Sequence, residues 1–255
     1  MGKKYIIFDF DGTLVHTNDV IIGSWQATYE HYLGRQVSRS QIEQTFGETL
    51  ADTIRNRIPG APVEEVKSYY RAWQEAHKGE LVYIYDGIRD LLAELRERGC
   101  VIGVGTSRTA SSLWNYLRQF GIVDYIDAVV TMDDVTRHKP HPDTALAVLA
   151  KMAGLEDSSK NAGNAGFKAD AENMSLKPGA GWTGQEAGTR IPADVLADAV
   201  MLGDSRFDIG CASNAGIDSV LTIWGRPIGE EEIATWDWRP TYIIERPEEL
   251  LKIVR

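Results

Sequence analysis

The sequence predicts an α/β protein, in which a doubly wound parallel sheet is joined to a small all-helical unit. Two observations predict the sheet. Short apolar runs alternate with helix-like segments along most of the chain, and each run is apolar at successive positions, as in strands buried on both faces. A third observation predicts the separate unit, because residues 15–80 interrupt the alternation with helical patterns only.

Length and composition restrict the class of protein. A chain of 255 residues can bury a full core, and 25% charged and 43% hydrophobic residues are ordinary for a globular protein. The net charge of −10 argues against a nucleic-acid partner, although it allows a small phosphorylated substrate. Cys100 and Cys211 are too few and too far apart for a disulfide framework. Because no apolar run approaches membrane-spanning length, we expect a soluble protein without a membrane partner, and the scarcity of cysteines fits a reducing cytoplasm. The oligomeric state stays open.

The first expected strand ends in two carboxylates. Residues 5–10 form an apolar run that contains Asp9 and leads to Asp11 and a Gly-Thr turn. Residues two apart in an extended segment point the same way, so both carboxylates project from the carboxyl end of the strand, where parallel sheets bind ligands. Their mutual repulsion favours a divalent cation. A plain turn is the alternative, whereas a calcium loop of the EF-hand type is disfavoured because Leu14 occupies the position of its glycine.

The helical block that follows has recognisable starts and stops. Asn18 or Asp19 can cap the first helix, and Gly34 ends it. Ser38 and Gln41 have the spacing of a capping box at the start of the second helix. A Pro-Gly-Ala-Pro segment separates the third helix from the fourth. The expected helices cover residues 18–33, 38–46, 49–57 and 63–77.

Strands and helices then alternate to the end of the chain. The expected strands cover residues 100–105, 128–131, 199–202, 219–223 and 241–244, and the expected helices cover residues 88–98, 110–120, 142–152, 208–214 and 247–254. Residues 154–193 fit neither pattern, because they are rich in glycine and have little apolar periodicity. We interpret this segment as an insertion of unknown purpose, either partly disordered or an added element.

Further polar residues follow the expected strands. Thr106 and Ser107 follow one strand, although a hydroxyl in this position is often only a turn or a helix cap. Lys139 precedes Pro140, and its ammonium group is a candidate for the same site. The alternative is an ordinary lysine on the protein surface. Asp204 and Asp208 follow the strand at 199–202 and are candidates for the same site. For Asp208 the alternative is a carboxylate at the start of a helix, where the helix dipole stabilises negative charge.

These four stretches resemble the four motifs of the haloacid dehalogenase (HAD) superfamily, beginning with Phe-Asp-Phe-Asp-Gly-Thr-Leu and ending with Gly-Asp-x-x-x-Asp. The resemblance implies a HAD-like Rossmannoid core made of residues 1–14 and 81–255, and a helical cap made of residues 15–80. It covers nearly the whole chain apart from the segment at 154–193.

The resemblance also implies roles for the residues of the motifs. Asp9 is the expected nucleophile, and Asp11 is the expected acid and base. Thr106, Ser107 and Lys139 are expected to bind the transferring phosphoryl group, and Lys139 also neutralises charge beside Asp9.

The expected cofactor is Mg²⁺. The resemblance implies that Asp9 and Asp204 bind it directly, that Asp11 contributes its backbone carbonyl, and that Asp208 binds through water or orients the other ligands. So few protein ligands suit Mg²⁺, which retains waters.

The activity implied is Mg²⁺-dependent hydrolysis of a small phosphorylated metabolite or of pyrophosphate, through an aspartyl-phosphate on Asp9. The segment His16-Thr17-Asn18-Asp19 is most similar to the branch that holds pyrophosphatases, phosphoglycolate phosphatases and β-phosphoglucomutases. A phosphomutase of the last kind and a phosphate-binding regulator with little turnover are the alternatives. A dehalogenase is disfavoured, because such members lack the carboxylate found at Asp11.

Overall fold

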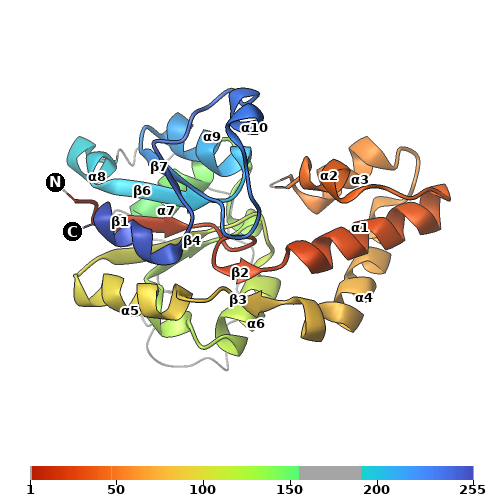
Figure 1. The fold of residues 1–255 in the computed structure, drawn as a ribbon, viewed down its shortest axis with the longest axis horizontal. Coiled ribbons are helices and arrows are strands. Elements are labelled where there is room, and N and C mark those ends of the chain that lie inside the picture. The colour runs from red at the N-terminus through yellow and green to blue at the C-terminus, as the bar shows by residue number, and fades with distance from the viewer. Residues whose placement is uncertain (1, 47, 155–190, 255) are drawn as a thin grey trace.

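A computed structural model describes residues 2–46, 48–154 and 191–254 of the chain. The centre of the fold is a six-stranded parallel sheet with the order β5-β4-β1-β6-β7-β8 (Figure 1). The predicted doubly wound α/β core with a helical cap is confirmed. Most of the segment expected to be an insertion, at 154–193, lies outside the described residues. The strands are β1 (Tyr5–Phe8), β4 (Val101–Gly105), β5 (Ala128–Val130), β6 (Ala199–Gly203), β7 (Asp218–Thr222) and β8 (Tyr242–Ile244).

Strand β1 is apolar throughout because helices cover both of its faces. Ile6 and Phe8 lie in a core cluster with Leu92 and Leu117, whereas Ile7, which points to the opposite face, lies in a cluster with Val148. The helices of the first face are α5 (Ile88–Glu97) and α6 (Ala110–Gln119). Those of the second face include α7 (Asp143–Met152), α8 (Ala193–Ala197) and α9 (Arg206–Ala215).

The cap packs around its own aromatic core. Trp25 and Tyr29 of its first helix form a buried cluster with Ile54, Val66 and Tyr70 from the later helices. The cap lies to one side of the sheet, to the right in Figure 1, and both chain termini lie at the far end of the core. Its helices are α1 (Asn18–Leu33), α2 (Arg39–Glu43), α3 (Leu50–Arg57) and α4 (Val63–Leu81).

The junction between core and cap differs from the sequence-based expectation. Residues 15–80 were expected to be helical, but β2 (Val15–His16) pairs in antiparallel fashion with β3 (Tyr83–Ile84). The helical part of the cap is therefore Asn18–Leu81. The two chain segments that connect the core to the cap pair with each other as a small antiparallel sheet. The strands were missed because two residues are too few for a periodicity to be seen.

Three smaller differences concern helices. The C-terminal segment is a 3₁₀-helix, η3 (Pro247–Lys252), and the short helices α8 and α10 (Glu230–Ala234) were not predicted. Pro142 precedes α7 as its N-cap and is not in its first turn. The capping box of Ser38 and Gln41 is present at the start of α2, as predicted.

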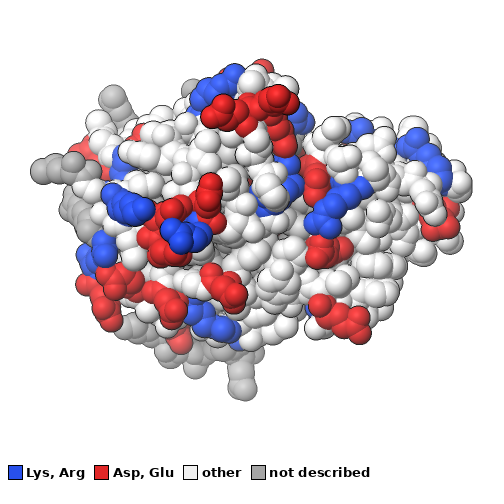
Figure 2. Space-filling model, viewed as in Figure 1, with Lys and Arg blue, Asp and Glu red and all other residues white. Residues whose placement is uncertain are grey.

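On the face shown in Figure 2, acidic and basic side chains alternate over core and cap, and no broad basic patch is seen among the described residues there. None of the helices in the described ranges combines the length and the apolar character needed to cross a bilayer.

Candidate active site

One cavity of about 430 Å³ between the core and the cap contains every site residue expected from the sequence. Strands β4, β1 and β6 are neighbours in the sheet, so their carboxyl ends meet at one edge, which faces the cap (Figure 1). The expected residues that line the cavity are Asp9, Asp11, Thr106, Ser107, Lys139, Asp204 and Asp208.

Lys139 joins two of the buried carboxylates. Its Nζ lies 2.8 Å from Oδ1 of Asp9 and 2.6 Å from Oδ1 of Asp208. Burial alone would lower the pKa of Lys139, but the carboxylates of Asp208 and Asp9 raise it above its ordinary value. Lys139 is therefore a buried ammonium group held in place by two charge-assisted hydrogen bonds, and not a surface lysine.

Asp9 and Asp204 carry more negative charge than the protein groups around them neutralise. Burial raises the pKa of Asp9 to about 7, against the opposing effect of Lys139. Burial also raises the pKa of Asp204 well above its ordinary value, and the carboxylates of Asp208 and Asp9 raise it further. Oδ2 of Asp204 is buried and has no hydrogen-bond partner among the described residues.

These carboxylates form a compact group. Asp9, Asp204 and Asp208 each offer an oxygen, and the three oxygens lie within 4.8 Å of one another. Gly12 closes one side of the group, because a Cβ atom on this residue would lie 2.1 Å from Oδ2 of Asp204. The donor set is all oxygen, buried and anionic, which is the chemistry that Mg²⁺ prefers.

Asp208 is positioned by a serine that the sequence analysis missed. Ser205 caps α9, and its hydroxyl donates to Oδ2 of Asp208 at 2.5 Å. Oδ1 of Asp208 is bound to Lys139, so protein donors occupy both carboxylate oxygens. A serine three residues before an acidic residue, at the start of a helix, is the signal that would have predicted this capping box.

Asp11 has partners that the sequence analysis also missed. Arg108 donates to it from two nitrogens, with Nε lying 3.0 Å from Oδ2 and Nη2 bonded to Oδ1. Thr17 donates its hydroxyl to Oδ1 at 2.5 Å. The only signal for Arg108 was its place two residues after Thr106, at the carboxyl end of the neighbouring strand.

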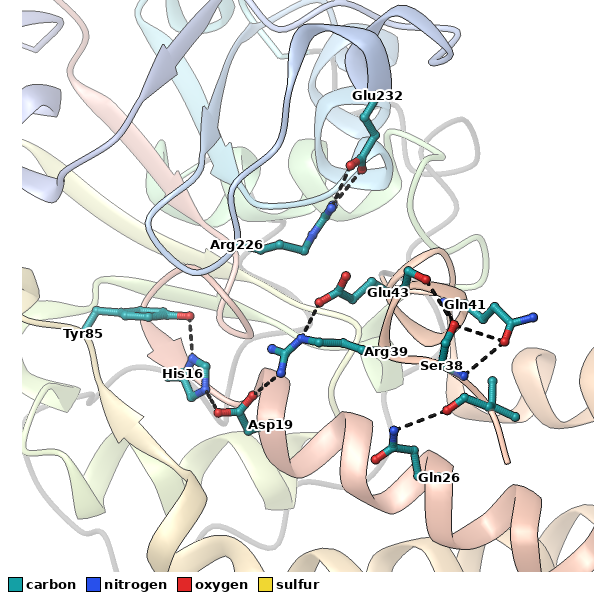
Figure 3. A network of polar contacts seen from close by, with 12 residues as sticks. His16, Asp19, Gln26, Ser38, Arg39, Gln41, Glu43, Tyr85, Arg226 and Glu232 are labelled. Carbon is teal, nitrogen blue, oxygen red and sulfur yellow. Dashed lines mark hydrogen bonds and ion pairs between the residues drawn. The ribbon is translucent and has the colours of Figure 1, made fainter. Parts of the chain in front are cut away.

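Polar contacts also run across the junction of core and cap (Figure 3). The hydroxyl oxygen of Tyr85, which follows β3, lies 3.0 Å from Nδ1 of His16. Nε2 of His16 lies 2.9 Å from Asp19, and Arg39 of α2 joins Asp19 to Glu43. His16 therefore belongs to the junction and is not among the residues that line the cavity, whereas Asn18 and Glu48 of the cap do line it.

The family of the chain is decided by comparison with family models. The model described as haloacid dehalogenase-like hydrolase matches residues 6–159, and a second, described as HAD-hydrolase-like, matches residues 137–250. The chain belongs to the haloacid dehalogenase-like hydrolases. The resemblance seen in the four motifs, and the expectation of an enzyme of this superfamily, are confirmed.

Individual members of the HAD family are similar to the chain over its whole length. A pyrophosphatase PpaX from Bacillus mycoides is 28% identical, with 100% of this chain and 98% of the relative covered. A second PpaX, from Bacillus pumilus, is 28% identical over 98% of this chain and 95% of its own length.

Solved structures show the same fold. A candidate phosphoglycolate phosphatase from Lactobacillus plantarum has a TM-score of 0.72 and 19% identity, with 99% of this chain and 100% of the other covered. A candidate β-phosphoglucomutase from Thermotoga maritima has a TM-score of 0.63 and 18% identity, with 98% and 97% covered. At these identities the likeness concerns the fold, including its core and helical cap.

Proposed function

We propose that the protein is a Mg²⁺-dependent phosphatase that hydrolyses pyrophosphate or a small phosphorylated metabolite. The observation that carries this proposal is the position of Asp9 at the carboxyl end of the central strand, where it lies beside Lys139 and the carboxylates of Asp204 and Asp208. The full-length similarity to pyrophosphatases named PpaX supports pyrophosphate as the first substrate to test.

The residues present fit a magnesium ion. Asp9 and Asp204 are the proposed carboxylate ligands, because Oδ2 of Asp204 is buried without a partner among the described residues, and the backbone carbonyl of Asp11 is the third. We assign Asp208 an orienting role, because Lys139 and Ser205 already occupy its two oxygens. When bound, Mg²⁺ supplies positive charge that neutralises the phosphoryl oxygens and reduces their repulsion from Asp9.

The reaction follows in two steps. Asp9 attacks phosphorus, the bond from phosphorus to the leaving oxygen breaks, and that oxygen takes the electron pair and a proton from the carboxyl group of Asp11. The carboxylate of Asp11 then accepts a proton from water as the water oxygen attacks the aspartyl-phosphate. Phosphate leaves, and Asp9 is restored. Lys139 and the hydroxyl groups of Thr106 and Ser107 hold the oxygens of the transferring group.

The test is the release of inorganic phosphate from pyrophosphate and from a panel of phosphomonoesters in the presence of Mg²⁺. Asp9→Asn should abolish release, because an amide is a poor nucleophile and a weaker ligand. Asp11→Asn should keep Mg²⁺ binding but lose about 10²–10⁴ of the rate. Asp90→Asn, at an exposed position on α5, is the control and should behave as the wild type.

Two results would contradict the proposal. Wild-type phosphate release by a folded Asp9→Asn protein would show that Asp9 is not the nucleophile. Loss of Mg²⁺ binding in Asp11→Asn would show that the side chain of Asp11 is needed for metal binding and not only for acid and base catalysis. The same assay distinguishes the alternatives, since a phosphomutase isomerises a sugar phosphate and a regulator binds without turnover.

A further inference from the structure

Arg108 is a partly buried cation that the four motifs do not explain. Its side chain is 11% exposed, and it binds both oxygens of Asp11. The guanidinium carbon lies 5.0 Å from the ring centre of Tyr116 and 5.6 Å from that of Phe10, and Nη1 donates to Ser112 at 2.7 Å. Aromatic rings and hydrogen bonds thus hold the plane of the guanidinium group at the wall of the cavity.

The proposed reaction places the leaving group beside Arg108. The attacking and leaving oxygens lie roughly in line through phosphorus, so the leaving group lies on the side away from Asp9. Asp11 must be within hydrogen-bond reach of the leaving oxygen to protonate it. Because Arg108 is bonded to the same carboxylate, substituents on the leaving group come within its reach.

A second arginine lines the same cavity. Arg71 of α4 is one of its wall residues and forms no salt bridge with any described residue. Lys78, also of α4, is by contrast paired with Glu75 at 2.7 Å. The cap therefore offers a guanidinium group to the same cavity, in addition to Arg108 from the core.

We propose that Arg108 is a specificity-determining residue that selects substrates whose leaving group is itself anionic, such as a second phosphoryl group or a carboxylate. This inference rests on the proposed function and names the substrate class of the same site. An anionic oxygen pair on the leaving group replaces the carboxylate of Asp11 as the bidentate partner of the guanidinium group. Asp11 is then released to contact the leaving oxygen. With a neutral leaving group, Arg108 stays hydrogen-bonded to Asp11.

The test compares matched pairs of substrates that differ in the charge of the leaving group. One pair is pyrophosphate and methyl phosphate, and the other is 2-phosphoglycolate and 2-hydroxyethyl phosphate, in which a hydroxymethyl group replaces the carboxylate. The wild-type enzyme should prefer the anionic member of each pair in kcat/KM. Arg108→Gln should reduce that preference about ten- to a hundredfold, which corresponds to the loss of a charged hydrogen-bonding partner.

Two further variants separate specificity from structure. Arg108→Lys keeps the charge without the bidentate geometry, so its preference should lie between those of the wild type and Arg108→Gln. Arg118→Gln changes an exposed arginine on α6, the helix that follows Arg108 in the chain, and should keep the wild-type preference. Thermal unfolding of each variant reports the fold, and a purely structural effect would reduce kcat/KM equally for both members of a pair.

The inference is overturned if the wild type prefers the neutral esters, or if Arg108→Gln leaves the ratio of the two kcat/KM values unchanged. Either result would leave the proposed phosphatase intact, provided that Asp9→Asn still abolishes phosphate release. If no substrate yields phosphate in a manner that depends on Asp9, the proposed function is wrong, and the inference falls with it.

Discussion

Replacing Gly12 with alanine should damage the site through one well-defined contact. Gly12 has a φ of 74°, and a Cβ atom there would lie 2.1 Å from Oδ2 and 2.5 Å from Cγ of Asp204. Atoms in folded proteins do not approach so closely, so the carboxylate of Asp204 must move by about 1 Å. The substitution thus displaces a proposed metal ligand without changing its charge.

The expected magnitude has two parts. Holding an alanine in the left-handed region costs about 1–2 kcal/mol, so the free energy of unfolding should fall by that amount. A displacement of about 1 Å in an active site costs about a hundredfold in rate, and disturbed ligand positions weaken metal binding about ten- to a hundredfold. The effect on turnover should therefore greatly exceed the effect on stability.

Gly216→Ala supplies the matched control. Gly216 follows α9 with a φ of 72°, and a Cβ atom there would have nothing within 4 Å. Both variants should lose similar stability in thermal or denaturant unfolding, but only Gly12→Ala should lose Mg²⁺-dependent phosphate release and Mg²⁺ affinity measured by calorimetry. If Gly12→Ala keeps wild-type turnover and Mg²⁺ affinity, the close packing of Gly12 against Asp204 has no role in the site, and the reasoning is refuted.

Three other predictions concern the same cavity. Asp208→Asn leaves one acceptor oxygen where Lys139 and Ser205 now use two, so kcat should fall about ten- to a hundredfold; an unchanged kcat would show that Lys139 needs no such support. Because burial raises the pKa of Asp9 from 3.8 to about 7, the folded metal-free protein binds more protons than the unfolded chain between these pH values. Its free energy of unfolding in EDTA should therefore fall as the pH rises through this window, and Asp9→Asn should flatten that dependence; equal slopes would contradict the assigned pKa. Glu48→Gln, in the cap wall of the cavity, should alter relative rates among substrates more than Mg²⁺ affinity, and unchanged ratios would locate specificity elsewhere.

The proposed site residues were predictable because of a property of parallel sheets. Each of Asp9, Thr106 and Asp204 comes directly after an apolar strand, and β1, β4 and β6 are neighbours, so their ends converge. The local pattern of each strand and the general rule for such sheets were enough to bring residues nearly 200 positions apart into one prediction. Lys139 required the resemblance to the superfamily, because nothing in its own surroundings distinguishes it from a surface lysine.

The partners of these residues were harder to predict, because they depend on how side chains lie in three dimensions. Ser205 had a local signal in its capping-box spacing to Asp208, although that spacing was not part of the prediction for Asp208. Arg108 had almost none, since its ion pair with Asp11 spans 97 positions and depends on the exact placement of β4 beside β1. The two-residue strands β2 and β3 depend on each other across the inserted cap, so neither has a pattern of its own.

Asp11 is the residue at which the cap and the chemistry of the core meet. Its backbone lies just after β1, while its side chain accepts hydrogen bonds from Arg108 of the core and from Thr17, the residue before α1. His16, next to Thr17, is hydrogen-bonded to Tyr85, which lies on the segment that leads from the cap back to the core. It also contacts Asp19 in the first turn of α1. The donors available to Asp11 therefore depend on the position of the cap as well as on the core. This explains why the proposed acid and base has partners that the motifs alone do not contain.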